Sequence, residues 1–359
     1  MEEQTVWRTS GVVIFWIVCS FAILFSPHLL KLKKHDTSAL NVFIWSGVVD
    51  PQMFVQFTQE TGIPINVSYY EGNEELLVKL LATKGKGYDM IAPSDYVVEY
   101  LIKNNLLKKI DKSKLNFYDK LNPKLMDLYY DPGNNYSIPS EWYVLGLGYL
   151  RKDYPNGLPE KSWGMLFNPA LMPKKIGLIN DSRELIMLAA WDKYRELREI
   201  NADEVQYLKG VLCEQKKHAE AYTDFRGDFL LRSGNCSLVT ASNAIMWKVV
   251  LEDENLGFDM PDQGVFLNIE NYVIPEASQK EDQVYALMNF LFRLDVQEHN
   301  YKTGLLLSTR RDAKFMFDEP ILKCSTRFID PESDIKVMLF KNLLTDDQVN
   351  EIWLAVKGE

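Results

Sequence analysis

The 359-residue sequence is poor in cysteine and histidine, with four of each. No cysteine pair has C-x-x-C spacing and no H-E-x-x-H is present, so the sequence offers no dedicated zinc site. Cys19 lies in an apolar N-terminal run, which leaves Cys213, Cys236 and Cys324 in the body of the chain. These three residues allow at most one bridge, which excludes a disulfide-stapled fold.

Motifs for nucleotide binding and nucleophilic catalysis are also missing. The sequence has no P-loop and no serine in a G-x-S-x-G elbow. Gly85-Lys86-Gly87 lacks the third glycine of a dinucleotide fingerprint and precedes an expected strand, so it is interpreted as a turn. We therefore expect no cofactor, no resident metal and no catalysed reaction.

Positive charge is in deficit, because the formal net charge is −10. A nucleic-acid binder would need a basic face to meet phosphates, so no nucleic-acid partner is expected. An acidic protein is compatible with a cationic ligand. The length favours two lobes, since single hydrophobic cores stop growing near ~250–300 residues.

The N-terminus carries an uncharged run at positions 11–25, preceded by Arg8 and followed by Lys31, Lys33 and Lys34. A membrane span needs ~20 apolar residues, so the run fits a signal-peptide core better than a stable anchor. No clean cleavage site follows, and residues 11–30 would extend the span, so cleavage and retention both stay open. Residues 1–38 are predicted to be a signal peptide or N-terminal membrane anchor, and the protein to be exported to the periplasm or cell envelope.

Beyond the leader, strands and helices alternate, which predicts an α/β fold with parallel, doubly wound sheets. In such sheets, ligands bind at the carboxyl ends of the strands. Asn73 is expected to cap a helix. The expected strands are 39–45, 63–69, 88–92, 136–149, 175–179 and 236–241, and the expected helices are 51–61, 73–81, 96–104, 183–200, 281–295 and most of 333–357.

The turn-rich segment 130–135 leads into a second body, and near residues 264–275 the chain is expected to return to the first. The sequence thus predicts lobe 1 at 39–140 and 266–310, and lobe 2 at 141–265 and 311–359 with the C-terminal helices. Two lobes joined by more than one crossover would hinge against each other.

Four short stretches, at 45–47, 93–96, 181–184 and 270–275, each lie where a strand is expected to give way to a helix or loop. Aromatic, hydroxyl and carboxylate side chains recur in them. This mixture suits a small cation held between two lobes. The candidate ligand-binding residues that they supply are Trp45, Ser46, Ser94, Tyr96, Asp181, Glu184 and Glu270.

Structural interpretations compete with this one. Trp45 could be a core residue, and Ser94 could be a helix N-cap. Asp181 and Glu184 have the spacing of a capping box, in which the two side chains bond each other's backbone N–H. Glu270 enters an otherwise apolar strand, where a carboxylate needs a partner.

Several stretches occur in an order that matches a known family: VFIWSG, FTQETGI, SYYEGNEELLVKL, YDMIAPSDYVVEYL, LLKKIDKSKL, YDPGNNYSIPSEW, INDSRELIMLAA and NFLFRLDV. Together they resemble the bacterial periplasmic spermidine/putrescine-binding proteins of ABC importers, over essentially all of residues 39–357. The resemblance implies a type II periplasmic-binding fold whose lobes close on a linear polyamine.

The resemblance assigns the same seven residues to the ligand, with Glu270 where the family commonly has aspartate. Aromatic positions of the family pattern differ here. Val48 and Asn268 stand at two of them, a tryptophan expected near Ser242 is absent, and Gly304-Leu305-Leu306 lacks a later tyrosine. The acidic positions therefore match the family better than the aromatic ones.

These observations predict a monomeric solute-binding protein that captures a polyamine or related small cation and delivers it to the membrane permease of an ABC transporter. ATP would be hydrolysed by a separate subunit. Three alternatives stay open: a ligand sensor that docks on a membrane receptor, binding of a different small solute, and a two-lobe hydrolase that uses the carboxylates as acid and base.

Overall fold

The computed structural model describes residues 16, 19–21, 38–223, 226–304, 307–313, 328 and 334–358. The chain divides into two compact units, Met1–Ala39 and Leu40–Glu359, and the second is described below. Most of the predicted leader lies outside the described residues. Among the helices that are described, none combines the length and hydrophobicity needed to cross a membrane.

The second unit is built on one mixed sheet with strand order β2-β1-β3-β9-β4-β7-β5-β6, to which β8, β10 and β11 add at the sides. The strands are β1 (Leu40–Trp45), β2 (Ile65–Tyr70), β3 (Met90–Ile91), β4 (Ser137–Leu150), β5 (Ile176–Ile179), β6 (Ala219–Thr223), β7 (Leu238–Ser242), β8 (Leu256–Asp259), β9 (Val265–Val273), β10 (Leu307–Ser308) and β11 (Val337–Leu339).

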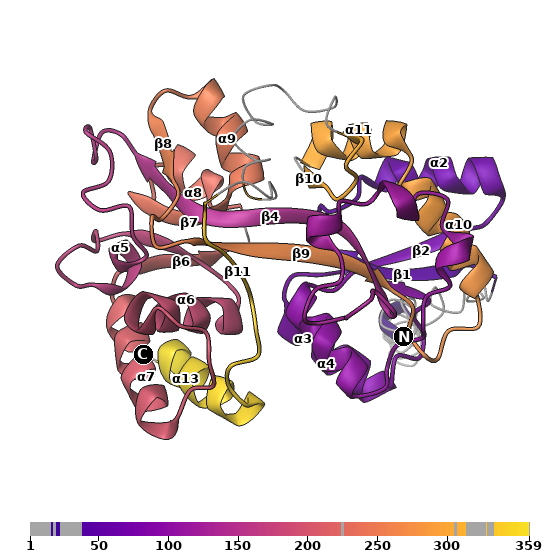
Figure 1. Cartoon of the computed structure of the whole chain (residues 1–359), viewed down its shortest axis with the longest axis horizontal. Coiled ribbons are helices and arrows are strands. Elements are labelled where there is room, and N and C mark those ends of the chain that lie inside the picture. The colour runs from indigo at the N-terminus through magenta and orange to yellow at the C-terminus, as the bar shows by residue number, and fades with distance from the viewer. Residues whose placement is uncertain are drawn as a thin grey trace, which may run out of the picture. The chain divides into compact units, whose positions relative to one another are not determined.

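Helices cover this sheet in two groups (Figure 1). The α-helices are α2 (Pro51–Thr61), α3 (Asn73–Thr83), α4 (Asp95–Lys103), α5 (Gly164–Phe167), α6 (Ser182–Tyr194), α7 (Ala202–Lys216), α8 (Asp228–Arg232), α9 (Asn243–Glu252), α10 (Glu281–Leu291), α11 (Leu294–Gly304) and α13 (Asp346–Gly358). Short 3₁₀ turns occupy Lys112–Lys114, Tyr118–Lys120 and Pro123–Leu125.

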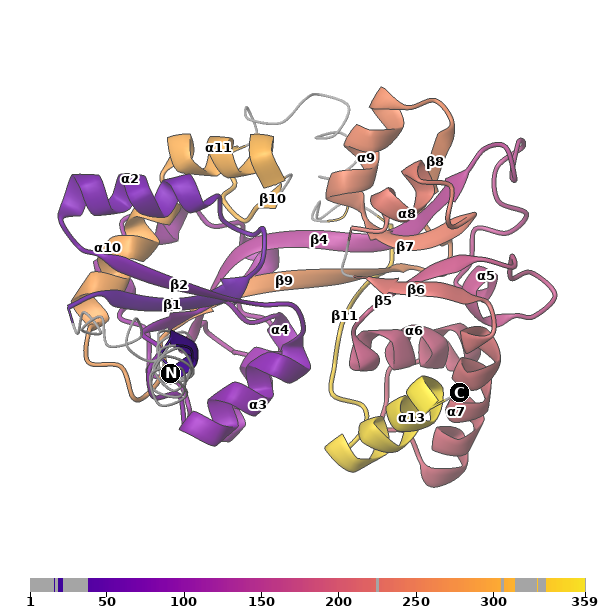
Figure 2. The same cartoon turned by 180° about the vertical axis from the view of Figure 1, so that it is seen from behind.

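Two halves are visible from both sides of the sheet (Figures 1 and 2). Lobe A contains β1–β3 with α2, α3, α4, α10 and α11, and lobe B contains β5–β8 with α5–α9 and α13. The long strands β4 and β9 run between the lobes as an antiparallel pair. The α/β two-lobe fold class is thereby confirmed, whereas the residue boundaries of the lobes stay a prediction.

The expectation of purely parallel sheets is wrong in one respect. β1 pairs in parallel with β2 and β3, and β5 with β6 and β7. β4 and β9, however, pair antiparallel with each other, and β9 also runs antiparallel to β3. Strands that carry the chain from one lobe to the other and back must point in opposite directions, and the βα pattern of the flanking segments does not report this.

Local sequence explains where α2 begins and ends. Asp50 accepts a hydrogen bond from the Gln52 N–H at 2.9 Å, and Pro51 fills the first helical position, where no donor is needed. Gly62 ends the helix in the left-handed conformation at φ 73°. Between these signals, Phe54 and Phe57 turn into the core.

Three of the predicted helices differ in detail. Asn73 is the first residue of α3 rather than its cap, because Gly72 takes the cap position and the Asn73 side chain bonds elsewhere. Arg195 adopts a left-handed φ of 58° and stops α6 before residue 200. The segment 281–295 divides into α10 and α11.

The C-terminal part is less helical than predicted. Val337–Leu339 adds to β9 as a parallel strand, and within the described range 334–358 only Asp346–Gly358 is helical. In Figure 1 this strand leads from the sheet down to α13, which contacts α6 and α7 of lobe B.

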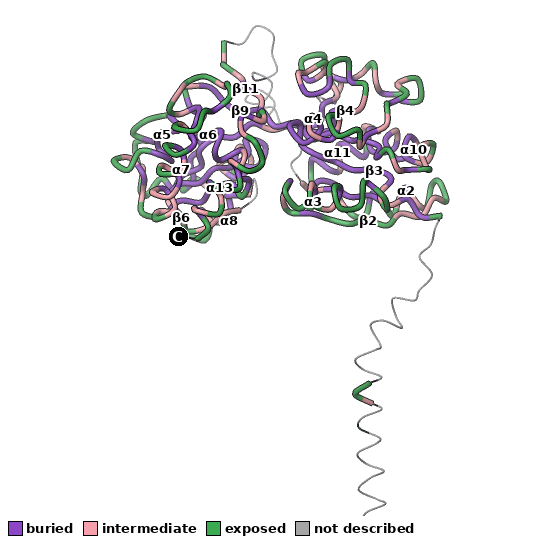
Figure 3. The backbone as a smooth tube through the Cα atoms, turned by 90° about the horizontal axis from the view of Figure 1, so that it is seen from below, coloured by how far each residue is buried: buried purple, intermediate pink, exposed green. Residues whose placement is uncertain are grey.

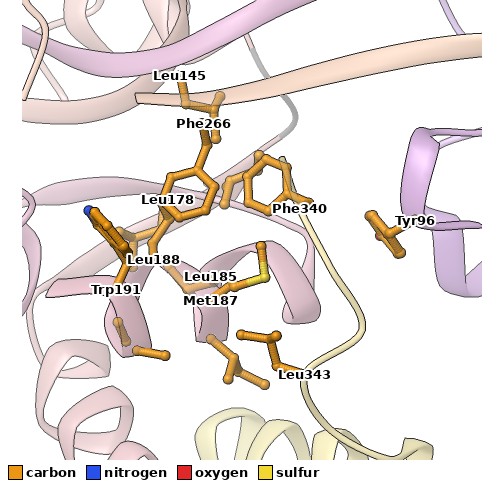
Figure 4. Packing of buried hydrophobic residues seen from close by; sticks show 14 of the residues in the cluster. Tyr96, Leu145, Leu178, Leu185, Met187, Leu188, Trp191, Phe266, Phe340 and Leu343 are labelled. Carbon is orange, nitrogen blue, oxygen red and sulfur yellow. The ribbon is translucent and has the colours of Figure 1, made fainter. Parts of the chain in front are cut away.

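Buried residues run through the interior of both lobes, and exposed ones lie on the outside (Figure 3). Under the sheet in lobe B, the packing joins Phe266 of β9, Phe340, and Trp191 of α6 (Figure 4). Figure 4 also shows Tyr96 on a separate helix, apart from the other labelled side chains. Cys236 is buried as a free thiol.

Candidate functional site

One pocket collects groups from both lobes and from the crossing strands. It lies where β1, β4 and β9 meet the start of α6 and the end of β7. It is lined by Trp45, Val48, Glu71, Glu141, Trp142, Tyr143, Ile179, Asn180, Asp181, Glu184, Ser242, Ala244 and Glu270. Four of the seven candidate ligand-binding residues are among them: Trp45, Asp181, Glu184 and Glu270.

The other three candidates lie outside this lining. Ser94 and Tyr96 are buried directly behind it and bond its carboxylates. Ser46 is exposed in the turn after β1, where its N–H donates to the Tyr70 carbonyl at 3.3 Å. The structure therefore brings six of the seven residues together and leaves Ser46 at the surface.

Glu270 projects from β9 and is only 5% exposed. Its Oε1 accepts a hydrogen bond from Ser94 Oγ at 2.9 Å, whereas Oε2 is buried without a partner. Burial raises the pKa of Glu270 to about 8, although the Ser94 hydroxyl and the nearby Trp45 indole N–H oppose this by favouring the charged form.

Asp181 has both of its oxygens satisfied by neutral donors. Oδ1 accepts the backbone N–H of Glu184 at 3.0 Å, which makes Asp181 the N-cap of α6. Oδ2 accepts from the Tyr96 hydroxyl and from Asn73 Nδ2. Burial, together with the Glu74 carboxylate, raises the pKa of Asp181.

The position of the Glu184 side chain distinguishes a capping box from a ligand-binding role for this acid pair. A capping box requires its side chain to return to the backbone N–H of Asp181. Instead, Oε1 accepts from Asn268 Nδ2 at 2.7 Å, and Oε2 is buried with no partner. Asp181 is thus the cap, and Glu184 faces the pocket.

The electrostatics of Glu184 follow from its surroundings. The side chain is 2% exposed. Burial raises the pKa of Glu184 well above its usual range, and the nearby carboxylates of Asp181, Asp95 and Glu270 add to the shift.

Aromatic rings form part of the wall. The Trp45 ring lies against Tyr70 with centroids 4.7 Å apart. Its indole N–H is buried without a hydrogen bond of ordinary geometry, so it is available to a ligand or to Glu270. Trp142 and Tyr143 of β4 are two further aromatic residues of the lining.

Positions where the family pattern has aromatic residues also meet here. Val48 and Ser242 line the pocket, and Asn268 holds Glu184. Leu305 and Leu306 lie outside the described residues. The pocket therefore has smaller and more polar walls than the family pattern implies.

Sequence reasoning missed Asn73, Asn268 and Glu141. Asn73 was interpreted as a helix cap, and an isolated asparagine carries no further signal. Glu141 did carry one, since it is a lone acid in the long apolar strand β4. The same argument that selected Glu270 would have selected it.

Hydrogen bonds between the two lobes lie beside the site. Asn73 Nδ2 of α3 donates to Asp181 Oδ2 at 3.1 Å, and Ser182 of α6 bonds Glu74 of α3 through both its N–H and its hydroxyl. These contacts join the start of α3 in lobe A to the start of α6 in lobe B.

The chemistry of the site is that of a cation acceptor. Glu141, Glu184 and Glu270 each keep a buried oxygen without a partner, and none forms an ion pair with a Lys, Arg or His of the described part of the chain. Buried carboxylates in this state are costly unless they are neutralised by a proton or a bound cation.

Comparison with known proteins identifies the family of this chain. Residues 52–315 match the family model described as "Bacterial extracellular solute-binding protein". The chain is 28% identical to a spermidine/putrescine-binding periplasmic protein of Escherichia coli, over 83% of this chain and 85% of the relative. It is 25% identical to a putrescine/cadaverine-binding protein of Pseudomonas aeruginosa, over 89% and 93% of the two chains.

A solved structure from Listeria monocytogenes, assigned as a candidate spermidine/putrescine ABC transporter, superimposes with a TM-score of 0.79. The two chains are 26% identical, and the match covers 89% of this chain and 99% of the other.

Proposed function

This chain belongs to the family of bacterial extracellular solute-binding proteins, and from this premise we propose that it captures a linear polyamine for an ABC importer. The ligand would be held in the pocket at Glu184 and Glu270 and passed to a membrane permease. The protein would act outside the cytoplasmic membrane, by binding alone and without catalysing a reaction.

The observation that carries this proposal is the pair of buried, unpaired carboxylate oxygens of Glu184 and Glu270 in one pocket. An ammonium group supplies both the positive charge and the N–H donors that these oxygens lack. The names of the Escherichia coli and Pseudomonas aeruginosa relatives, which refer to spermidine, putrescine and cadaverine, support the same ligand class.

The remaining residues would orient the ligand. Ser94 and Asn268 each hold one oxygen of an acid, which leaves the other oxygen for an ammonium group. The Trp45 ring would pack on the methylenes or on a cationic nitrogen, a contact worth roughly 0.5–2 kcal/mol.

A thermal-shift titration of the full-length protein tests this proposal. Putrescine and spermidine should raise the melting temperature and change the tryptophan fluorescence to which Trp45 contributes, because a ligand that binds only the native state stabilises it. Glu184→Gln should abolish the shift without lowering the ligand-free melting temperature, because an amide in this buried position costs no more than the carboxyl group. Glu254→Gln, at an exposed position, is the control. A shift with a sugar or an anion but none with millimolar polyamine would remove the assignment.

A further inference from the structure

A bulge in β4 changes which residue stands opposite Glu270. The register pairs Pro139 with Asn271, and it then pairs Glu141, rather than Ser140, with Glu270. Directly opposed residues of an antiparallel pair point to the same face of the sheet. The extra residue therefore turns the Glu141 side chain to the face that carries Glu270, as bulges commonly do beside functional sites.

The bulge is held by its own hydrogen bonds. Ser140 Oγ donates to the Glu270 carbonyl at 3.0 Å, and Thr309 Oγ1 donates to the Pro139 carbonyl at 2.7 Å. Ser140 and Thr309 are both fully buried. A backbone irregularity with satisfied polar groups places Glu141 at a fixed position in the wall of the pocket.

Glu141 has no structural partner that explains its burial. It is 3% exposed, and its Oε2 is buried without a hydrogen bond. Asp131, which is buried to a similar degree, shows what a structural acid in this protein does. It accepts the N–H groups of Asn135, Tyr136 and Ser137 and the Ser137 hydroxyl.

The number of acids that lack a partner limits the number of ammonium groups that the ligand should carry. Both oxygens of Asp181 accept hydrogen bonds, from Tyr96 and Asn73 and from the N-terminus of α6, so neither of them lacks a donor. Among the residues that the structure describes, the acids with an unpaired buried oxygen that line the pocket are Glu141, Glu184 and Glu270. Three ammonium groups would neutralise them, whereas two would leave one acid either unpaired or protonated.

We propose that Glu141 is a ligand-binding residue that makes the pocket a three-carboxylate site, selective for linear triamines with three charged nitrogens over diamines with two. This inference rests on the proposed function and goes beyond it, because the diamine and triamine classes both fit a pocket with Glu184 and Glu270 alone.

The test compares spermidine with putrescine by calorimetry on the full-length wild-type chain and on Glu141→Gln, which keeps the size of the side chain. The wild type should bind spermidine more tightly. In the variant, spermidine should lose roughly 30-fold or more in affinity, the range expected when one partner of a buried charge pair is removed. Putrescine should stay within about threefold of its wild-type affinity, because it never needed the third acid.

Controls separate this inference from the proposed function. Glu254→Gln removes one exposed negative charge and should behave as the wild type. If Glu141→Gln does not fold, Glu141→Met supplies a second side chain of similar length. Equal affinities of the wild type for both amines, or an equal loss of both in the variant, would overturn the role of Glu141. A wild type that binds neither amine would instead overturn the proposed function.

Discussion

At the scale of single residues, the acids of the site lower the stability of the ligand-free protein. Glu184 and Glu270 are each buried with one oxygen unsatisfied, and a hydrophobic or amide side chain of similar size would cost less there. Binding sites commonly retain such groups because the ligand, rather than the protein, completes them. The consequence is a measurable dependence of stability on pH.

Glu270→Gln should stabilise the ligand-free protein, and more so as the pH rises. The folded protein holds the Glu270 proton up to a pKa of about 8, whereas an unfolded glutamate releases it near ~4.3. At a pH below ~4.3, Glu270 is protonated in both the folded and the unfolded protein, and its burial then carries no cost of ionisation. As the pH rises toward 8, the unfolded state gains stability by releasing the proton, so the free energy of unfolding of the wild type falls. The gain in unfolding free energy should be small at pH 5 and on the order of 1–5 kcal/mol at pH 8.

Urea unfolding of both proteins at pH 5, 6, 7 and 8 measures this difference. Glu254→Gln, at an exposed position, should show no trend across the same range. A gain that stays constant or shrinks as the pH rises would mean that Glu270 is ionised in the empty site, contrary to its burial.

The sequence predicted the acids of the site better than their surroundings. Glu184 and Glu270 could be found because each is an acid at the edge or inside of an apolar segment. Asn73 and Asn268 could not, because a neutral amide fits a loop, a cap or a core network equally well, and only the fold shows which. Ser46 was selected through its neighbour Trp45, although the chain turns away from the pocket directly after that residue.

At the scale of elements, β4 organises the molecule. It pairs with β9, β7, β8 and β10, and every residue of it except Tyr143 is buried. Its long extended pattern was predictable, but its antiparallel direction and its bulge were not, since both depend on partner strands that are distant in sequence. The absence of a side chain at Gly257 allows β8 to approach β4 closely.

Gly257→Ala should destabilise the protein by about 2 kcal/mol or more. In the β4–β8 pair, Gly257 stands opposite Tyr149, and an added Cβ would lie 2.2 Å from the tyrosine ring. Overfilling of a packed site forces side chains from their rotamers and shifts the backbone.

Gly210→Ala is the matched control, because it makes the same change within α7 where nothing lies within 4 Å of the added atom. It should stabilise the protein by about 0.5–1 kcal/mol, since alanine loses less backbone entropy in a helix. Thermal unfolding of the two variants compares them. An unchanged or higher melting temperature for Gly257→Ala would show that Tyr149 moves aside at no cost.

At the scale of the whole second unit, the two lobes are linked beside the site as well as through the crossing strands. The side-chain amide of Asn73 donates to Ser94 and Tyr96 in lobe A and to Asp181 in lobe B. Asn342 adds a further link by donating to the Tyr96 carbonyl and to Glu99. Hinged lobes connected by a few polar contacts are expected to exchange between open and closed states.

Asn73→Ala should shift this exchange toward the open state. The variant removes donors from Asp181 Oδ2 and from Tyr96, and a hydrogen bond to a charged group contributes about 1.5–3 kcal/mol. Apparent affinity for polyamine falls with the fraction of closed protein, so a loss of about tenfold or more is expected without any change to Glu184 or Glu270.

Small-angle scattering separates this effect from a direct loss of ligand contacts. Ligand-free Asn73→Ala should have a larger radius of gyration than the ligand-free wild type, and saturating spermidine should bring both to the same value. Asn66→Ala removes an exposed amide contact to Asn41 within lobe A and should change neither quantity. Weaker binding of spermidine with an unchanged radius of gyration would mean that Asn73 acts on the pocket itself and does not hold the lobes together.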